Sequence, residues 1–237
     1  MKKMKFMALF MSVALIFGSC ASMNKTGKGA LIGGGSGAAL GAIVGGIFGK
    51  GKGAAIGAAV GSAVGAGTGA LIGRKMDKAA AQAKQIEGAQ VEQVTDNNGL
   101  QAVKVTFDSG ILFNTGNANL SVAAKAALSK FANNVLNQNR DMDVAIYGYT
   151  DNQGWKNSTA EQSAQKNINL SQERAQSVSS YLLNCGVSPN QIKSVQGLGE
   201  SDPIASNATV EGQAQNRRVE VYMYASAQMI KDAEAGK

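Results

Sequence analysis

The sequence contains no histidine among its 237 residues and only two cysteines. Histidine is the commonest general base and the commonest metal ligand in proteins. Its absence excludes Ser-His-Asp and Cys-His catalytic sites, as well as zinc sites with histidine ligands. Two cysteines cannot build a zinc knuckle or a disulfide framework. The sequence therefore predicts a protein without a metal or cofactor.

Proline and aromatic residues are also scarce, with two prolines and 5% aromatic residues against 30 glycines. The glycines follow no three-residue period, which excludes collagen. The net charge of +7 arises in residues 1–78, because acidic residues outnumber basic ones from residue 79 onward. Positive charge confined to the front of the chain favours contact with a membrane over contact with nucleic acid.

Residues 1–19 have the pattern of a secretory signal peptide. Basic residues precede an apolar segment at 6–17, which is shorter than the roughly 20 residues that a membrane span requires. Small residues then lead directly into Cys20, an arrangement that resembles a bacterial lipobox, in which the cysteine is acylated and becomes the mature N-terminus. By the sorting rule for such lipoproteins, the alanine after Cys20 favours the outer membrane. The alternative is an ordinary signal peptide with an incidental cysteine.

Glycine recurs at every fourth position from Gly29 to Gly73. Each interior glycine costs a soluble helix about 1 kcal/mol relative to alanine, whereas in a membrane small residues four apart let two helices approach closely. Two uncharged stretches, 30–49 and 54–73, flank a charged turn. Each is long enough as a helix to match the hydrocarbon thickness. Residues 29–78 thus resemble glycine-zipper segments of bacterial envelope proteins. They predict a membrane-associated helical hairpin with the capacity to form a homo-oligomer, or alternatively a collapsed or disordered spacer.

The composition becomes that of an ordinary globular domain from residue 91 onward. Alternating residues at 103–107 predict a strand, and residues 143–149 predict another. Apolar residues at helical spacing over 120–136 predict a helix between these two strands.

A second helix is predicted by the apolar spacing over 175–185, with Ser171 as its N-cap and Gly186 at its end. Strands near Val195 and over 218–223 complete an α/β sandwich with a covered sheet. The predicted boundaries are a lipidated N-terminus and linker at 20–28, a second linker at 79–90, the domain at 91–228, and a tail at 229–237.

Five segments of this domain resemble, in the correct order, the OmpA-like peptidoglycan-binding family. They are residues 112–120 (LFNTGNANL), 147–154 (YGYTDNQG), 167–175 (NINLSQERA), 197–203 (GLGESDP) and 216–220 (NRRVE). With the lipobox and the zipper added, the whole chain resembles an OmpA-family outer-membrane lipoprotein of the glycine-zipper type. The resemblance implies a mixed sheet with helices packed on it, a lipid anchor in the outer membrane and a domain in the periplasm.

Peptidoglycan stem peptides of the diaminopimelate type present an ammonium beside a carboxylate, so a receptor needs an anion and a cation in a shielded cleft. Asp151, just past a strand end, supplies the anion. Arg174, predicted in the first turn of a helix, supplies a planar fork for the carboxylate, and the helix N-terminus adds N–H donors. The resemblance assigns these two residues their ligand roles. It aligns five others, less securely, with supporting positions: Thr150, Asn152, Asn114, Arg217 and Arg218.

Some alternatives stay open at this point. An exposed ion pair is the alternative role for Asp151 and Arg174, and strand alternation lets only one of the two adjacent arginines face the cleft. Asp151 and Arg174 stand 23 positions apart, farther than the family pattern places them, and the extra residues fall in 154–166. This segment is a lid or an enlarged surface loop, and Trp155 within it stacks on sugar or packs the loop.

These patterns predict a non-catalytic tether that joins the outer membrane to peptidoglycan. The expected partners are peptidoglycan, outer-membrane lipid and further copies of the chain, with no nucleic acid. The alternative is a zipper-driven membrane oligomer or pore in which wall binding is secondary. A wall-cleaving enzyme is disfavoured, because the candidate carboxylate faces an arginine, an arrangement suited to binding rather than proton transfer.

Overall fold

The structure is a computed structural model that describes residues 66–95, 100–114 and 116–236. The predicted acylation of Cys20, the first arm of the predicted hairpin and the turn after that arm lie outside the described residues. Among the helices that the structure describes, none combines the length and the apolar character needed to cross a membrane.

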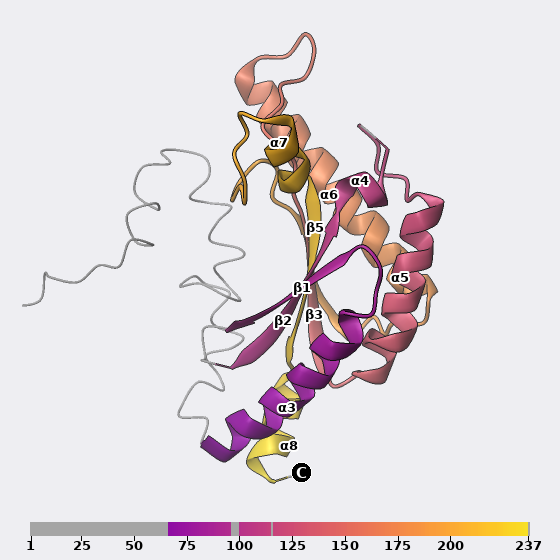
Figure 1. The fold of residues 1–237 in the computed structure, drawn as a ribbon, viewed down its shortest axis with the longest axis vertical. Helices are drawn as coiled ribbons and strands as arrows, with labels where there is room; N and C mark the ends of the chain where they lie inside the picture. Colours follow the sequence, from indigo (N-terminus) through magenta and orange to yellow (C-terminus); the bar gives the residue numbers. More distant parts are fainter. Residues whose placement is uncertain (1–65, 96–99, 115, 237) are drawn as a thin grey trace, which may run out of the picture. The chain divides into compact units, whose positions relative to one another are not determined.

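A five-stranded mixed sheet forms the centre of the described region (Figure 1). The strands are β1 (Ala89–Thr95), β2 (Gln101–Asp108), β3 (Met142–Gly148), β4 (Ile192–Gly197) and β5 (Arg218–Ala225). Their order across the sheet is β1-β2-β5-β3-β4. The pair β3–β4 is parallel, and the other neighbouring pairs are antiparallel. The predicted mixed sheet is therefore confirmed.

Helices pack on one face of this sheet, and Figure 1 shows α5 and α6 on the same side of it. The helices are α3 (Ala66–Ala83), α4 (Ser109–Leu112), α5 (Val122–Asn134), α6 (Ala160–Asn184), α7 (Val210–Asn216) and α8 (Ala227–Glu234), with a short 3-10 helix η3 at Leu136–Gln138. The main core joins alternate residues of the central strands to apolar residues of α3, α5, α6 and α8. Phe107 of β2 meets Phe131 of α5 edge to face, with ring centroids 5.5 Å apart. The helix-covered sheet agrees with the predicted α/β architecture.

Helix α6 begins much earlier than its apolar spacing predicted. Thr159, not Ser171, is the N-cap, and it forms a capping box with Gln162. Ser171 lies inside the helix, where its hydroxyl donates to the Ile168 carbonyl oxygen and accepts from the Gly199 N–H. The buried face of the first half of α6 is polar, so the hydrophobic period stops where the helix continues. The sequence signal for the true start was the S/T-x-x-E/Q pattern at residues 159–162.

Two glycines let α6 approach the ends of the parallel strands. A Cβ at Gly148 of β3 would lie 2.2 Å from the Ser171 carbonyl oxygen, and one at Gly197 of β4 would lie 2.1 Å from the Gln172 backbone nitrogen. No side chain fits at either position without moving the helix. This close packing fixes the middle of α6 against the sheet edge at which β3 and β4 end.

The boundaries at both ends of the domain differ from the predicted ones. Helix α3 reaches back to residue 66, into the expected second arm of the hairpin, and Ile72 and Met76 are fully buried in the core of the sheet domain. The predicted linker 79–90 contains the end of α3 and the start of β1. The rest of that arm, residues 54–65, lies outside the described residues. The predicted tail likewise contains most of α8, with Met229 buried.

Candidate ligand-binding site at the end of the sheet

The register of the sheet brings the ends of four strands together at one end of the sheet. Asp108 pairs with Arg218 between β2 and β5, while Gly148 of β3 pairs with Val219 of β5 and with Gly197 of β4. The loops that follow β2, β3 and β4 and the turn that precedes β5 therefore meet at this end. These are the segments that contain the residues with predicted site roles.

Asp151 follows β3 by three residues and is buried, with 6% of its surface exposed. Its Oδ1 accepts the Gln153 N–H at 3.2 Å, and its Oδ2 accepts from Nη1 of Arg217 at 2.5 Å. The side chain of Arg217 is 35% exposed. Asp151, the predicted anion of the site, thus forms an ion pair with Arg217. The sequence analysis did not predict this pairing.

Arg174 lies in the middle of α6 and is 3% exposed. Its Nε donates to the Asn117 carbonyl oxygen at 3.1 Å, and its guanidinium lies over the ring of Phe113, 5.2 Å from the centroid. Within the described residues, no hydrogen-bond partner is found for its two terminal nitrogens. Arg174 is therefore held by its inner nitrogen and its flat face, while its outer fork remains available.

The electrostatics of Arg174 follow from burial and from two charged neighbours. Burial, and to a lesser extent the positive charge of Arg217, lower the pKa of Arg174 to about 10, while the negative charge of Asp151 opposes both effects. At neutral pH the guanidinium is still charged. Arg174, Arg217 and Asp151 together give this cluster one net positive charge, so it attracts an anion.

The predicted support from a helix N-terminus is wrong. That prediction placed Arg174 in the first turn, whereas α6 begins at residue 160. The effect of the helix dipole falls off within the first turn, so the backbone of α6 provides neither free N–H donors nor a helix terminus at Arg174. The extra residues that separate Asp151 from Arg174 extend the helix instead, and Figure 1 shows this end of α6 projecting past the strands.

Asn167 joins this extension to the Asp151 loop. Its Nδ2 donates to the carbonyl oxygens of Asp151 and Gln153 and to Oε2 of Glu200. Its Oδ1 accepts from Nε1 of Trp155 at 2.8 Å. The sequence reasoning gave Asn167 no role, although it opens the NINLSQERA segment. Trp155 packs its loop against α6, one of the two roles considered for it.

Of the four remaining predicted site residues, three lie in the loops after β3 and α4, and Arg218 belongs to a separate cluster. Thr150 is buried beside Asp151, and its hydroxyl has no hydrogen-bond partner in the described region. Asn152 and Asn114 are exposed at the rim, in the loops after β3 and α4. Arg218 does not join the cluster.

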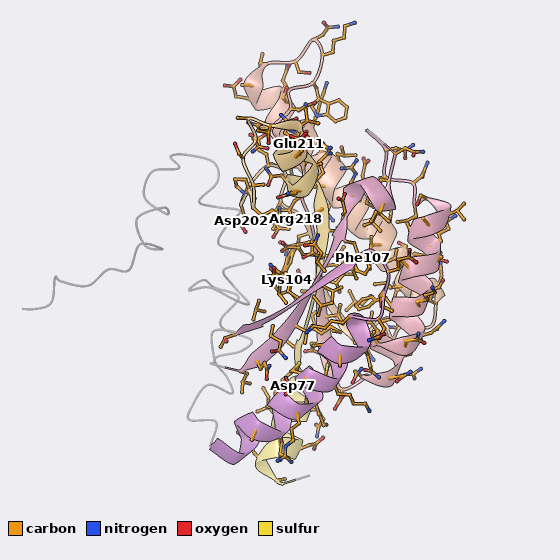
Figure 2. The ribbon with its side chains drawn as sticks, in the orientation of Figure 1. Asp77, Lys104, Phe107, Asp202, Glu211 and Arg218 are labelled. Atoms are coloured by element: carbon orange, nitrogen blue, oxygen red, sulfur yellow. The ribbon has the colours of Figure 1, made fainter. Side chains whose placement is uncertain are left out.

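Arg218 belongs to a second cluster, on the other face of the sheet, in which Arg218, Glu220 and Tyr149 are buried. Its Nε donates to Oε1 of Glu220 at 2.7 Å, and its guanidinium lies 3.7 Å from the ring centroid of Tyr149. Figure 2 shows Arg218 beside Asp202, whose carbonyl oxygen accepts a further hydrogen bond from it. Oε2 of Glu220 accepts from the hydroxyl of Tyr222. Of the two adjacent arginines, only Arg217 reaches the candidate site.

The described residues contain no group of three or more cysteine, aspartate or glutamate side chains suited to holding a metal ion. The candidate site instead presents one carboxylate and two guanidinium groups. Such a set is suited to a small zwitterion or anion, which it would hold through charge-assisted hydrogen bonds.

Two families match the sequence. Residues 112–217 match the OmpA family, and residues 1–77 match a family described as the YMGG-like Gly-zipper. The chain therefore carries an OmpA-family domain and a glycine-zipper segment, which confirms the resemblance found in the sequence.

Curated relatives resemble the C-terminal part of the chain. "Probable lipoprotein YiaD" of Escherichia coli is 37% identical over 56% of this chain and 54% of its own length. "Peptidoglycan-binding protein ArfA" of Mycobacterium tuberculosis is 42% identical over 51% of this chain and 34% of its own length. The chain thus spans between about a third and about half of the length of these relatives.

Solved structures share the fold. A MotB-like protein from Desulfovibrio vulgaris superposes with a TM-score of 0.55 at 24% identity, over 67% of this chain and 98% of that one. The cell wall anchor of the T6SS from Pseudomonas aeruginosa superposes with a TM-score of 0.50 at 26% identity, over 64% of this chain and 97% of that one. These neighbours support the mixed α/β fold.

Proposed function

We propose that this chain, whose residues 112–217 form an OmpA-family domain, is a non-catalytic tether between the outer membrane and peptidoglycan. Its domain binds the amino acid head of diaminopimelate in the stem peptide, with Arg174 on the carboxylate and Asp151 on the ammonium. The observation that carries the proposal is the state of Arg174. It is a nearly buried cation whose two terminal nitrogens have no hydrogen-bond partner in the described region.

A carboxylate satisfies the outer fork of Arg174 because a guanidinium presents two parallel N–H donors that match its two oxygens. The contacts with Asn117 and Phe113 hold the guanidinium plane in place before the ligand arrives. Little ordering entropy is then lost on binding. Burial strengthens the new hydrogen bonds, since the local dielectric constant is below that of water.

The ammonium binds Asp151 alongside Arg217. Each carboxylate oxygen can accept two hydrogen bonds. In the described region Oδ1 of Asp151 accepts one from Gln153, and Oδ2 accepts one from Arg217. In this proposal the ligand ammonium donates to the remaining acceptor positions of these oxygens. Thr150 precedes Asp151 in the chain, and its buried hydroxyl has no partner in the described region. In this proposal it supplies a further hydrogen bond, and the exposed Asn114 and Asn152 contribute from the neighbouring loops.

The membrane side of the tether rests on residues 1–77. The match to the YMGG-like Gly-zipper family covers this segment, and a lipobox-like pattern leads into Cys20. A relative bears the name lipoprotein, and another is named as peptidoglycan-binding. Acylation of Cys20 places the N-terminus in the outer membrane and the domain in the periplasm. Replacing Cys20 by serine should abolish labelling by a fatty acid and release protein from the membrane fraction.

The binding half of the proposal is tested by calorimetry of the full chain in detergent with a diaminopimelate-containing muropeptide. Asp151→Ala and Arg174→Ala should each weaken binding about ten- to a hundredfold, the value of one hydrogen bond to a charged group. The double variant should lose less than the sum of the two free-energy changes, because both residues hold one ligand head.

The matched control is Arg140→Ala, which removes an exposed arginine whose Nε bonds only the nearby Asn137 carbonyl oxygen. Binding by this variant should equal that of the wild type. Circular dichroism must first show that each variant is folded. Wild-type affinity in folded Asp151→Ala and Arg174→Ala variants would refute the assigned site.

A further inference from the structure

An open groove of about 640 Å³ lies between α6 and the segment that leads into α5. Its walls come from the residues after Asn117, from Lys125 in α5 and from one face of α6. On α6 the lining positions are Glu173, Gln176, Ser177, Ser180, Tyr181 and Asn184. They recur at three- and four-residue spacing, which places them in a continuous stripe along the helix.

This groove begins where the Arg174 site ends. The Asn117 carbonyl oxygen accepts from Arg174, and the next residues, 118–120, line the groove. On the helix, Glu173 lines the groove and Arg174 serves the site. From Glu173 to Asn184 the helix rises about 16 Å, whereas one extended amino acid residue spans about 3.5 Å. The groove is therefore long enough for a part of the ligand well beyond a single diaminopimelate head.

The chemistry of the lining is mostly uncharged. Amide and hydroxyl side chains, which both donate and accept hydrogen bonds, dominate it, and the charges of Lys125 and Glu173 cancel. Tyr181 adds an aromatic ring, and its hydroxyl lies 2.9 Å from the Ser129 hydroxyl, which fixes the ring in place. A neutral ligand rich in hydroxyl and amide groups matches this surface.

We infer that the groove binds the N-acetylated amino sugars of the glycan strand, next to the stem peptide held by Arg174. The inference rests on the proposed function. The other candidate portion, the stem peptide between sugar and diaminopimelate, carries a free glutamate carboxylate, for which the groove offers no net positive charge. The muramic acid carboxyl is consumed in its amide bond to the peptide, so the sugars are neutral. Their hydroxyl and acetamido groups pair with the lining amides and hydroxyls, and Tyr181 stacks on a sugar face.

The test compares two ligands on the full chain in detergent: a free stem peptide that ends in diaminopimelate, and the same peptide on its disaccharide. Wild type should bind the disaccharide form about tenfold more tightly, the effect of one or two net hydrogen bonds. Ser180→Trp, which fills the groove at an exposed position, should abolish this difference and leave affinity for the free peptide unchanged. The control Leu183→Trp places the same side chain at an exposed α6 position that does not line the groove, and it should behave like wild type.

The outcomes separate this inference from the proposed function. Equal wild-type affinity for the two ligands overturns the groove assignment and leaves the Arg174 site intact. A parallel loss of both ligands in Ser180→Trp also overturns it, since the groove then holds the peptide. Failure of the wild type to bind either ligand refutes the proposed function itself.

Discussion

The adjacent residues Arg217 and Arg218 belong to two different charged clusters, one partly exposed at the candidate site and the other buried. Arg217 is about one-third exposed and pairs with Asp151 at the rim of the candidate site. Arg218 is 1% exposed, and its guanidinium is held by Glu220, by Tyr149 and by two carbonyl oxygens. An arginine that binds a ligand must keep some of its N–H donors without a protein partner, as Arg174 does. An arginine that stabilises the fold, such as Arg218, has its N–H donors bonded and its guanidinium packed on a ring. The following predictions test this distinction, from the largest expected effect to the smallest.

The largest effect should come from Arg218→Met. It leaves the carboxylate of Glu220, which is 2% exposed, without its ion partner. Loss of one partner of a buried pair costs about 3–5 kcal/mol. The free energy of unfolding, measured by circular dichroism in urea, should fall by that amount. Arg217→Met is the matched control, and its loss should be clearly smaller, because Arg217 is about one-third exposed and Arg174 also lies near Asp151. Similar losses in the two variants would contradict the division of roles.

Replacing both ends of the buried pair should be milder than replacing one. Arg218→Met combined with Glu220→Leu removes the uncompensated charge along with its partner, and such apolar replacements are often nearly neutral. The double variant should recover roughly half or more of the stability that Arg218→Met loses. The same urea titration measures it. A double variant less stable than the single one would show that the two residues do not act as a pair.

Arg174→Lys should make ligand binding sensitive to pH. Burial and the nearby charge of Arg217 lower the pKa of Arg174 only to about 10, so the wild-type cation persists at pH 9. A lysine starts near 10.4, and the same burial lowers its pKa further, so its charge is lost as pH rises toward 9. Affinity for the muropeptide should therefore fall between pH 7 and pH 9 about tenfold more in the variant than in the wild type. The wild type corrects for titration of the ligand, and parallel pH profiles would argue against a buried cation at this position.

The smallest effect should come from Arg217→Gln. The change removes the cluster's net positive charge, which weakens attraction for the ligand carboxylate. It also frees an oxygen of Asp151 for the ammonium. These two consequences oppose each other, and Arg217 is about one-third exposed to solvent, so affinity in the same calorimetry should change by no more than about threefold. A loss as large as that of Arg174→Ala would move Arg217 into the direct ligand contacts.

The polar half of α6 marks the limit of reasoning from sequence periodicity. Val178 and Leu182 face the core, and their spacing predicted this part of the helix correctly. Gly186, with a φ of 86°, ends the helix as predicted. Closer to the site, the inward-facing residues include Asn167 and Ser171, which bond to loops instead of packing in the apolar core. A helix whose buried face turns polar loses its hydrophobic period, and here that change coincides with the candidate site.

The sequence by itself determined the family and several of the central elements. Alternation predicted β2 and β3, apolar spacing predicted α5, and five ordered segments led to the OmpA family, because these signals depend on residues close together in the chain. The tertiary structure alone decided three matters: the docking of α3 on the sheet, the pairing of Asp151 with Arg217, and the burial of Arg218 with Glu220. Asp151 and Arg217 are 66 positions apart. Which charges meet, and which remain free for a ligand, depends on strand register and burial, and no local pattern of residues encodes either.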